Sequence, residues 1–325
     1  MSWMELSLDA THEAVDWVRT LLAATHYTGD VSLVKYDALN LHPLTEQDRV
    51  QSQWAFTIYL YLPYDIRASA RVDEIVNQLS PLYRTGSIAA IEIAVVEEKP
   101  EYSRTLSSPV HRIGQRFVVL APDAPHQSEV ADEVTLRLSP TLAFGSGLHP
   151  ATVLTLQLLE RYIFPEMNVL DLGSGSGILS VAMAKLGARV LALDNDNIAV
   201  QSTQDAVRCN GVEQQVTVRE GSLGCGSHLG HWMGGDSINN VPIIEAAATF
   251  DLIATNILAR VHIALADDYR RALRRTDART GLLITAGFTI DRENEVSTAL
   301  TEVGFEAVDC ERFNEWVALA HRLKL

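Results

Sequence analysis

The sequence of 325 residues contains few cysteines, a deficit of positive charge and no long apolar run. Its three cysteines, Cys209, Cys225 and Cys310, are scattered and form no C-x-x-C pair. This pattern argues against a disulfide framework or a zinc ribbon and favours a reducing compartment. No stretch approaches the roughly 18 uninterrupted apolar residues of a membrane-spanning helix, so we expect no membrane partner. The first residues also lack the basic and apolar segments of a signal peptide, and together these absences predict a cytoplasmic protein.

Basic residues are outnumbered by acidic ones, 26 to 41, which gives a formal net charge of −15. Binding to nucleic acid needs a surface that neutralises phosphates, so we expect no direct nucleic-acid binding. An acidic surface would suit a basic partner, although it is more often only a solubility feature. With 47% hydrophobic and 21% charged residues, the composition is that of a globular chain long enough for two domains.

Residues 1–98 alternate between strand-like and helix-like patterns. Apolar residues recur with a period of two in some stretches and with helical spacing in others. The resulting order, βαββαβ, predicts a small ferredoxin-like α+β domain with its helices on one face of the sheet. Such a domain more often binds or positions a partner than performs chemistry. The expected strands are 3–10, 29–38, 54–63 and 88–98, and the expected helices are 11–24 and 68–82.

Residues 99–140 have the features of a connector between two domains. Proline and serine occur there as turn signals, in patterns that do not fit the interior of a helix or strand. We therefore predict a linker with short strands. The turn signals lie at 99–100, 107–109 and 121–127, and the expected strands are 116–121 and 133–139.

Residues 141–325 show strands that alternate with helices. Alternation of this kind implies right-handed βαβ units and a mostly parallel sheet. The last two strand-like stretches, 305–313 and 316–323, have no helix between them. We therefore expect them to form an antiparallel pair at the edge of the sheet.

One stretch, residues 224–249, interrupts this alternation. It is rich in glycine and long for a connection, so we expect a mobile surface insertion. Cys225, His228 and His231 within it are possible metal ligands. Because no further cysteine or carboxylate cluster accompanies these three, no metal site is expected.

The segment DLGSGSG at 171–177 lies between a predicted strand and a predicted helix. Its backbone N–H groups would face a ligand bound over the carboxyl edge of the sheet. A dinucleotide fingerprint has glycines at its first, third and sixth positions, and here Gly173 and Gly175 fit but the sixth position is Ile178. The departure disfavours a pyrophosphate and hence a nicotinamide oxidoreductase. It favours a nucleoside cofactor without phosphate, such as S-adenosylmethionine, although ordinary turn chemistry would also account for the glycines.

Three polar residues follow the next strands of this domain. Asp194 ends the strand after the glycine loop, where a carboxylate can accept hydrogen bonds from ribose hydroxyls or can cap the following helix. Ser222 lies in EGSL after the third strand, where an adenine ring would lie. Asn256 ends the fourth strand in ATNIL. Its amide offers a donor and an acceptor, so it can hold an amine or the methionyl end of a cofactor, or cap the next helix.

A second glycine-bearing turn, LAFGSGLHPAT at 142–152, precedes the glycine loop. Together with VLDLGSGSGILSVAMAKLGA, LALDNDNIAV, FDLIATNILA and NEWVALAHR, it resembles the bacterial methyltransferases that modify ribosomal protein L11. The resemblance is close over residues 136–325 and only architectural before them. It implies an S-adenosylmethionine-dependent enzyme that methylates lysine side-chain and α-amino nitrogens of a basic ribosomal protein. Its plan would be a recognition domain at 1–98, a linker at 99–140, and a seven-stranded, Rossmann-like class I methyltransferase domain at 141–325.

The resemblance also implies roles for particular residues. The two glycine turns would enclose the sulfonium of one cofactor between them. Asn256 would orient the amine, and no general base is assigned. His149 would line the site, or would only fix the His-Pro turn. By resemblance the cofactor residues are Thr152, Gly173, Asp194 and Asn256, and the lining residues are Phe144 and His149.

The sequence departs from the family pattern in three places. The stretch before IGQRF lacks the tryptophans and the lysine that the family usually has there, Ser146 and Leu148 stand where threonines are usual, and residues 224–249 are additional. These departures leave the cofactor segments intact but concern the substrate. A methyltransferase of another protein or of a small amine is therefore an alternative, as is a non-catalytic module that keeps the cofactor.

Overall fold

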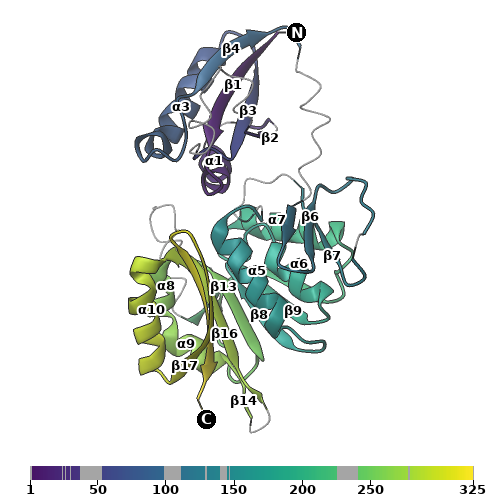
Figure 1. Cartoon of the computed structure of the whole chain (residues 1–325), viewed down its shortest axis with the longest axis vertical. Helices are drawn as coiled ribbons and strands as arrows, with labels where there is room; N and C mark the ends of the chain where they lie inside the picture. The colour runs from purple at the N-terminus through teal and green to yellow at the C-terminus, as the bar shows by residue number, and fades with distance from the viewer. Residues whose placement is uncertain are drawn as a thin grey trace, which may run out of the picture. The chain divides into compact units, whose positions relative to one another are not determined.

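The chain forms two compact units, which the computed structural model in Figure 1 shows as ribbons. The first comprises residues 1–110 and 140–149, and the second comprises residues 111–139 and 150–325. None of the described helices is long and apolar enough to cross a membrane. The structure describes residues 2–23, 25, 27–29, 31–36, 53–98, 111–128, 130–139, 145, 147–224, 241–276 and 279–324.

The first unit contains a four-stranded antiparallel sheet in the order β2-β3-β1-β4. Apolar side chains on alternate positions of β1 pack with those of two helices, which lie on the same side of the sheet (Figure 1). This is the arrangement that period-two strands and amphipathic helices produce when both bury their apolar faces. The elements are β1 (Trp3–Ala10), α1 (Ala14–Ala23), β2 (Val31–Lys35), β3 (Phe56–Pro63), α3 (Ala68–Arg84) and β4 (Glu92–Val96).

A small three-stranded sheet belongs to the second unit, although its residues fall in the predicted linker. It consists of β5 (His111–Ile113), β6 (Phe117–Leu120) and β7 (Val134–Arg137). Asn210 ties it to the rest of the unit, because its Oδ1 accepts from the Arg137 N–H at 2.9 Å and its Nδ2 donates to the Arg137 carbonyl at 2.6 Å. These strands are therefore part of the larger unit's structure rather than a free connector.

The second unit is built on a seven-stranded sheet in the order β10-β9-β8-β13-β16-β18-β17. Neighbouring strands from β10 to β16 pair in parallel, whereas β18 is antiparallel to both β16 and β17. The predicted α/β class, with an antiparallel pair at the edge, is confirmed. The strands are β8 (Asn168–Leu172), β9 (Arg189–Asp194), β10 (Val216–Glu220), β13 (Leu252–Asn256), β16 (Leu282–Thr289), β17 (Phe305–Phe313) and β18 (Trp316–Leu323).

Helices cover both faces of this sheet (Figure 1). In β13, Leu252 and Ala254 belong to one apolar core and Ile253 belongs to the other. Burial on both faces is the reason that such strands read as continuous apolar runs. One face carries α5 (Pro150–Tyr162), α6 (Ile178–Lys185) and α7 (Asn197–Cys209), and the other carries α8 (Ala259–Ala264), α9 (Ala266–Ala272) and α10 (Ile290–Glu302).

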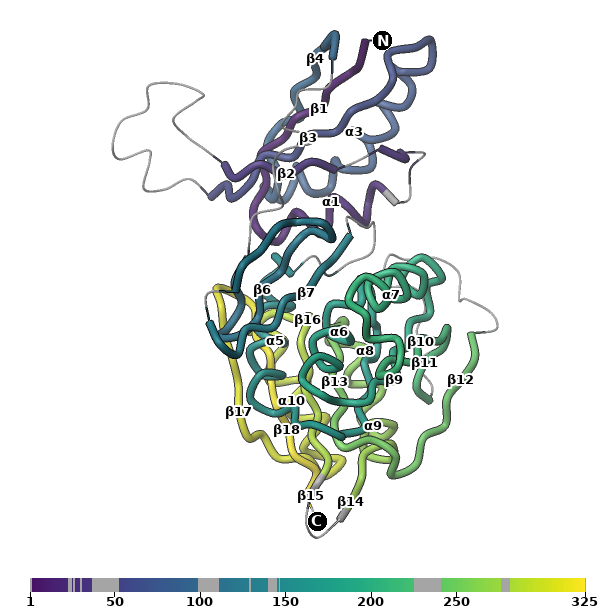
Figure 2. The backbone as a smooth tube through the Cα atoms, turned by 90° about the vertical axis from the view of Figure 1, so that its right-hand side faces the viewer, coloured from purple at the N-terminus to yellow at the C-terminus, as the bar shows by residue number. Residues whose placement is uncertain are grey.

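Two short strand pairs complete the unit. β11 (Ser222–Leu223) pairs in parallel with β12 (Ile243–Ile244), which lies within the predicted insertion at 224–249. β14 (Arg275–Thr276) and β15 (Arg279–Thr280) form a hairpin near the C-terminus (Figure 2). Cys225, His228 and His231 lie outside the described residues. Among the residues that are described, no group of three His, Cys, Asp or Glu side chains could hold a metal ion.

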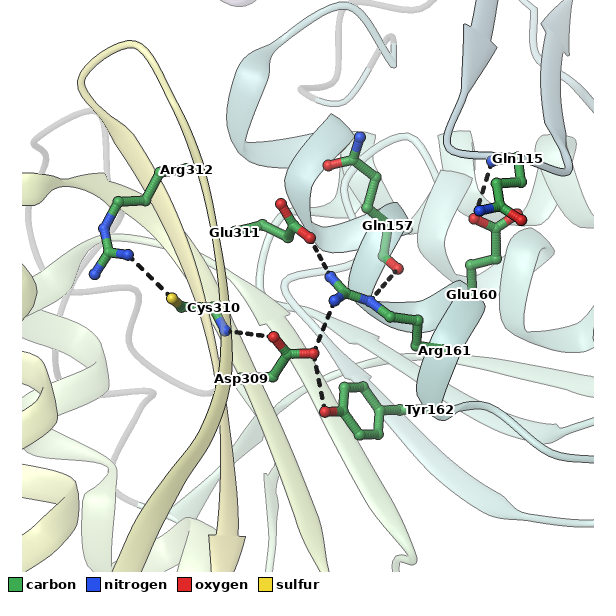
Figure 3. A network of polar contacts seen from close by, with 9 residues as sticks. All are labelled: Gln115, Gln157, Glu160, Arg161, Tyr162, Asp309, Cys310, Glu311 and Arg312. Carbon is green, nitrogen blue, oxygen red and sulfur yellow. Dashed lines mark hydrogen bonds and ion pairs between the residues drawn. The ribbon is translucent and has the colours of Figure 1, made fainter.

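A polar network holds the end of α5 against the edge strand β17 (Figure 3). Arg161 forms ion pairs with Asp309, at 2.9 Å, and with Glu311. Tyr162 donates a hydrogen bond from its hydroxyl to Asp309 at 2.9 Å. Partly exposed pairs of this kind each contribute little to stability. Together they fix the direction of α5. The first turn of this helix reaches the carboxyl edge of the sheet.

Candidate functional site

The candidate site lies at the carboxyl edge of the parallel strands. β8 is the first strand of this sheet in the chain, and it lies between β9 on one side and β13 on the other. The order of strands therefore reverses at β8, and the loops after β8, β9 and β13 emerge beside one another. Crevices at such reversal points are where open α/β sheets bind ligands.

The glycine loop after β8 uses backbone conformations that favour glycine. Gly173, Gly175 and Gly177 have φ angles of 79°, 54° and 82°, in the left-handed region. Thr203 of α7 supports the loop, because its Oγ1 donates to the Gly175 carbonyl at 3.0 Å and lies 2.8 Å from the Ser174 hydroxyl. Sequence reasoning missed Thr203, since nothing local marks a helical threonine as a partner of a distant loop.

Asp194 joins the glycine loop to the turn after β9. Its Oδ2 accepts from the Gly175 N–H at 2.9 Å, and its Oδ1 accepts from the Asp196 N–H at 3.0 Å. The cap of α7 is Asp196, which accepts from the Ile198 N–H at 2.9 Å. The alternative that Asp194 is itself the helix cap is therefore wrong. A carboxylate can accept about four hydrogen bonds, so these contacts are compatible with further donors from a ligand.

Asn256 and Thr152 meet although they are 104 residues apart in the sequence. The Asn256 Nδ2 donates to the Thr152 Oγ1 at 3.3 Å, and Thr152 is buried in the first turn of α5. The other atom of the amide, Oδ1, is also buried and has no hydrogen-bond partner within the described part of the chain. An unsatisfied buried acceptor costs about 1–3 kcal/mol. This oxygen is therefore suited to an N–H donor that a ligand brings.

Asp171 is another carboxyl group near this edge, and sequence reasoning did not select it. It is fully buried in β8, and Ser180 donates a hydrogen bond to its Oδ2 at 2.5 Å. Its Oδ1 has no partner among the described residues. Burial raises the pKa of Asp171 to about 7, and the charge of Asp194 acts in the same direction against the hydrogen bonds from Ser180. The signal available in the sequence was a charged residue inside the apolar run VLDLG.

The remaining predicted site residues are Ser222, His149 and Phe144. Gly221 donates from its N–H to the Asp194 carbonyl at 2.8 Å, which brings the EGSL segment with the buried Ser222 beside Asp194. His149 is buried, and burial lowers its pKa to about 3, so the ring is neutral at pH 7. It belongs to the first unit, so its contribution to the site stays a prediction. Phe144 lies outside the described residues.

We expect Gly177→Ala to destabilise the protein more than Gly211→Ala, measured by urea unfolding. Both glycines have positive φ angles, +82° and +66°, so both variants incur the cost of a left-handed residue, about 1–2 kcal/mol. A Cβ at Gly177 would also lie 2.9 Å from the Thr203 Cα, whereas nothing lies within 4 Å at Gly211. Overpacking of this kind adds about 1–3 kcal/mol. Equal losses would show that α7 does not confine the loop.

We expect Asp171→Asn to gain stability relative to the original protein as the pH rises. The folded pKa of about 7 lies above the ordinary aspartate value of 3.8, so the stability contributed by the protonated carboxyl is complete below about pH 4 and is lost as the pH rises through 7. Asparagine does not titrate. The difference in unfolding free energy between the two ligand-free proteins should therefore move in favour of the variant by roughly 2–3 kcal/mol from pH 5 to pH 8. Parallel pH profiles would contradict the raised pKa.

Comparisons with known proteins identify the family of this chain. A family model described as ribosomal protein L11 methyltransferase (PrmA) matches residues 2–324. The ribosomal protein L11 methyltransferase of Chloroflexus aurantiacus is 39% identical over 330 residues, covering 99% of this chain and 98% of that protein. The one from Herpetosiphon aurantiacus is 37% identical over 331 residues and 99% of each chain.

A solved structure is also similar. The crystal structure of ribosomal protein L11 methylase from Lactobacillus delbrueckii subsp. bulgaricus matches with a TM-score of 0.52 and 27% identity, covering 66% of this chain and 98% of that chain. The family model spans nearly every residue, and two relatives exceed 30% identity over almost their whole length. The chain therefore belongs to the ribosomal protein L11 methyltransferase family.

Proposed function

We propose that this protein transfers methyl groups from S-adenosylmethionine to amino nitrogens of ribosomal protein L11, on lysine side chains, the α-amino group or both. The observation that carries the proposal is the convergence of a glycine loop, a carboxylate and an amide at one edge of the sheet. Each of these groups matches a part of the donor or of the acceptor amine. Membership of the family, whose description names a methyltransferase of ribosomal protein L11, gives independent support.

The residues present fit S-adenosylmethionine. The loop containing Gly173 and Gly175 has Ile178 at the sixth position, where a pyrophosphate needs a glycine, and its Gly175 N–H is held by Asp194. Asp194 would accept hydrogen bonds from the ribose hydroxyls, and Ser222 would line the adenine side. Thr152 would hold the methionyl end, together with the Asn256 amide that contacts its hydroxyl. When bound, this cofactor supplies a methyl group that is already activated on a sulfonium sulfur.

The protein must then present a neutral amine and exclude water. A lysine amine has a pKa of about 10.4 in water, so loss of its proton is the demanding step at pH 7. A buried entrance disfavours the ammonium form and lowers this pKa. The Asn256 Oδ1 would accept one N–H of the neutral amine, which leaves the nitrogen lone pair free to point at the methyl group. No residue is assigned as a general base.

The remaining assignments concern the rest of the chain. We assign substrate recognition to residues 1–98, which contain an apolar core of their own and carry no glycine loop. The net charge of −15 suits a basic ribosomal protein and disfavours direct contact with nucleic acid. A cytoplasmic location is supported by Cys209 and Cys310, the two cysteines within the described residues, which are both free thiols.

We expect Asp194→Ala to weaken the binding of S-adenosylmethionine at least tenfold, about 1.4 kcal/mol, in isothermal titration calorimetry. The variant removes acceptors for the ribose and also releases the Gly175 N–H from its support. The matched control is Asp196→Ala, which removes a carboxylate two residues away that caps α7. The control should change affinity much less. Unchanged affinity in Asp194→Ala would remove Asp194 from the site.

We expect ribosomal protein L11 to lose mass in whole methyl units when this gene is deleted from its host. Intact-mass spectrometry of the ribosomal proteins measures this, and purified enzyme with S-adenosylmethionine should restore the lost mass in vitro. If L11 keeps its mass but another protein or a small amine accepts methyl groups, the chemistry stands and the substrate is wrong. If no acceptor is found although the cofactor binds, the chain is a non-catalytic binding module.

A further inference from the structure

A buried histidine, His262 of α8, lies beneath the turn that follows β13. Its side chain is completely buried, and the proposed mechanism does not use it. A polar ring with no exposure in an apolar core needs hydrogen-bond partners, so the identity of those partners shows what the ring holds in place.

The contacts define the orientation of the ring. Nε2 lies 2.9 Å from the carbonyl oxygen of Ala286, which can only accept, so Nε2 carries the hydrogen. Nδ1 is then the acceptor and faces the Tyr269 hydroxyl at 3.3 Å. Phe288 packs edge-on against the ring, with centroids 5.4 Å apart and an interplanar angle of 74°. The ring is thus held from three sides.

The same carbonyl connects His262 to the candidate site. The Ala286 oxygen also accepts from the Ile257 N–H at 3.0 Å, and Ala286 is the register partner of Asn256 in the sheet. One side chain therefore holds both the residue after Asn256 and the strand opposite it.

Gly287 shows how close the Asn256 side-chain amide lies to the backbone that follows Ala286. Gly287 has a φ of +93°, and a Cβ there would lie 2.5 Å from the Ile257 oxygen and 2.8 Å from the Asn256 Oδ1. The Asn256 amide therefore rests directly on the backbone that His262 fixes. A shift of the Ala286–Gly287 backbone would change the direction of Oδ1.

His262 acts as a neutral hydrogen-bonding group. Burial lowers its pKa to about 4, and its hydrogen bond to the Ala286 backbone only partly opposes this. The ring is uncharged at pH 7, and its one N–H already binds Ala286. It is therefore not available as an acid or a base in the reaction.

We propose that His262 is a positioning residue: through the Ala286 carbonyl and the Ile257 backbone it sets the direction in which Asn256 presents its amide to the acceptor amine. This inference rests on the proposed function of Asn256 and goes beyond it by assigning the support of that amide. His262 itself would not touch the cofactor or the acceptor amine.

A matched pair of variants tests the proposal in the full-length protein. In His262→Gln the longer amide can place an N–H near the position of Nε2, whereas in His262→Asn the shorter one cannot reach Ala286. With unmethylated ribosomal protein L11 and S-adenosylmethionine, we expect kcat to fall at least tenfold in His262→Asn and less than threefold in His262→Gln. Without any cofactor, the side-chain amide signal of Asn256 in an NMR spectrum should shift in His262→Asn and return in His262→Gln.

The control is another buried histidine, His321 of β18, which lies 3.4 Å from the Ser297 hydroxyl. His321→Asn should lower the unfolding temperature but leave the Asn256 signal in place. A role of His262 in stability alone would make the two histidine variants alike in the NMR spectrum and in kcat, and that result would overturn the proposal.

A double-mutant cycle separates the positioning role of His262 from the proposed role of Asn256. If His262 acts through Asn256, the loss caused by His262→Asn disappears in the Asn256→Ala background. Losses that multiply would show that His262 acts independently of Asn256 and would overturn the positioning role alone. Unchanged activity in Asn256→Ala by itself would overturn the proposed role of Asn256 and, with it, this inference.

Discussion

The parallel pairing of β8 with β9 and β13 is the constraint on which the rest of the site depends. Parallel strands end at the same edge, so residues that follow them meet regardless of their separation in the sequence. From β8 the chain first adds β9 and β10 on one side and later adds β13 and β16 on the other. The glycine loop after β8 thereby lies between the turns that carry Asp194 and Asn256. No local feature of any one of these segments could bring the three together.

The apolar cores on both faces of the sheet offset the free-energy cost of burying polar groups at this edge. Asp171 and Asn256 each keep a buried oxygen without a partner among the described residues, at a cost of about 1–3 kcal/mol for each such group. Helices on the two faces bury enough apolar surface to offset such losses. Buried polar atoms are left without hydrogen-bond partners where a ligand is expected to bind, as is common at functional sites. The core is therefore what permits an unsatisfied site.

Several expectations from the sequence agree with the structure for identifiable reasons. The α/β class follows from strands that are apolar on both faces, and the antiparallel edge follows from the absence of a helix between 313 and 316. Family membership follows from motifs whose residues are adjacent in sequence. By contrast, β5 to β7 read as a linker because turn signals dominate there. They are attached by contacts remote in sequence: their apolar side chains join the core of the unit, and Asn210 binds the Arg137 backbone 73 residues away.

The sequence by itself determined the fold class, the glycine loop and the family, because periodicity, turn chemistry and short motifs are properties of neighbouring residues. Only the tertiary structure decided which polar groups become partners. Thr152 meets Asn256, Thr203 supports Gly175, and His262 reaches the Ala286 carbonyl. It also decided that Asp196 rather than Asp194 caps α7. The physical reason is that a hydrogen bond depends on distances of a few ångströms, and between segments remote in sequence these distances exist only after the strands have paired in register.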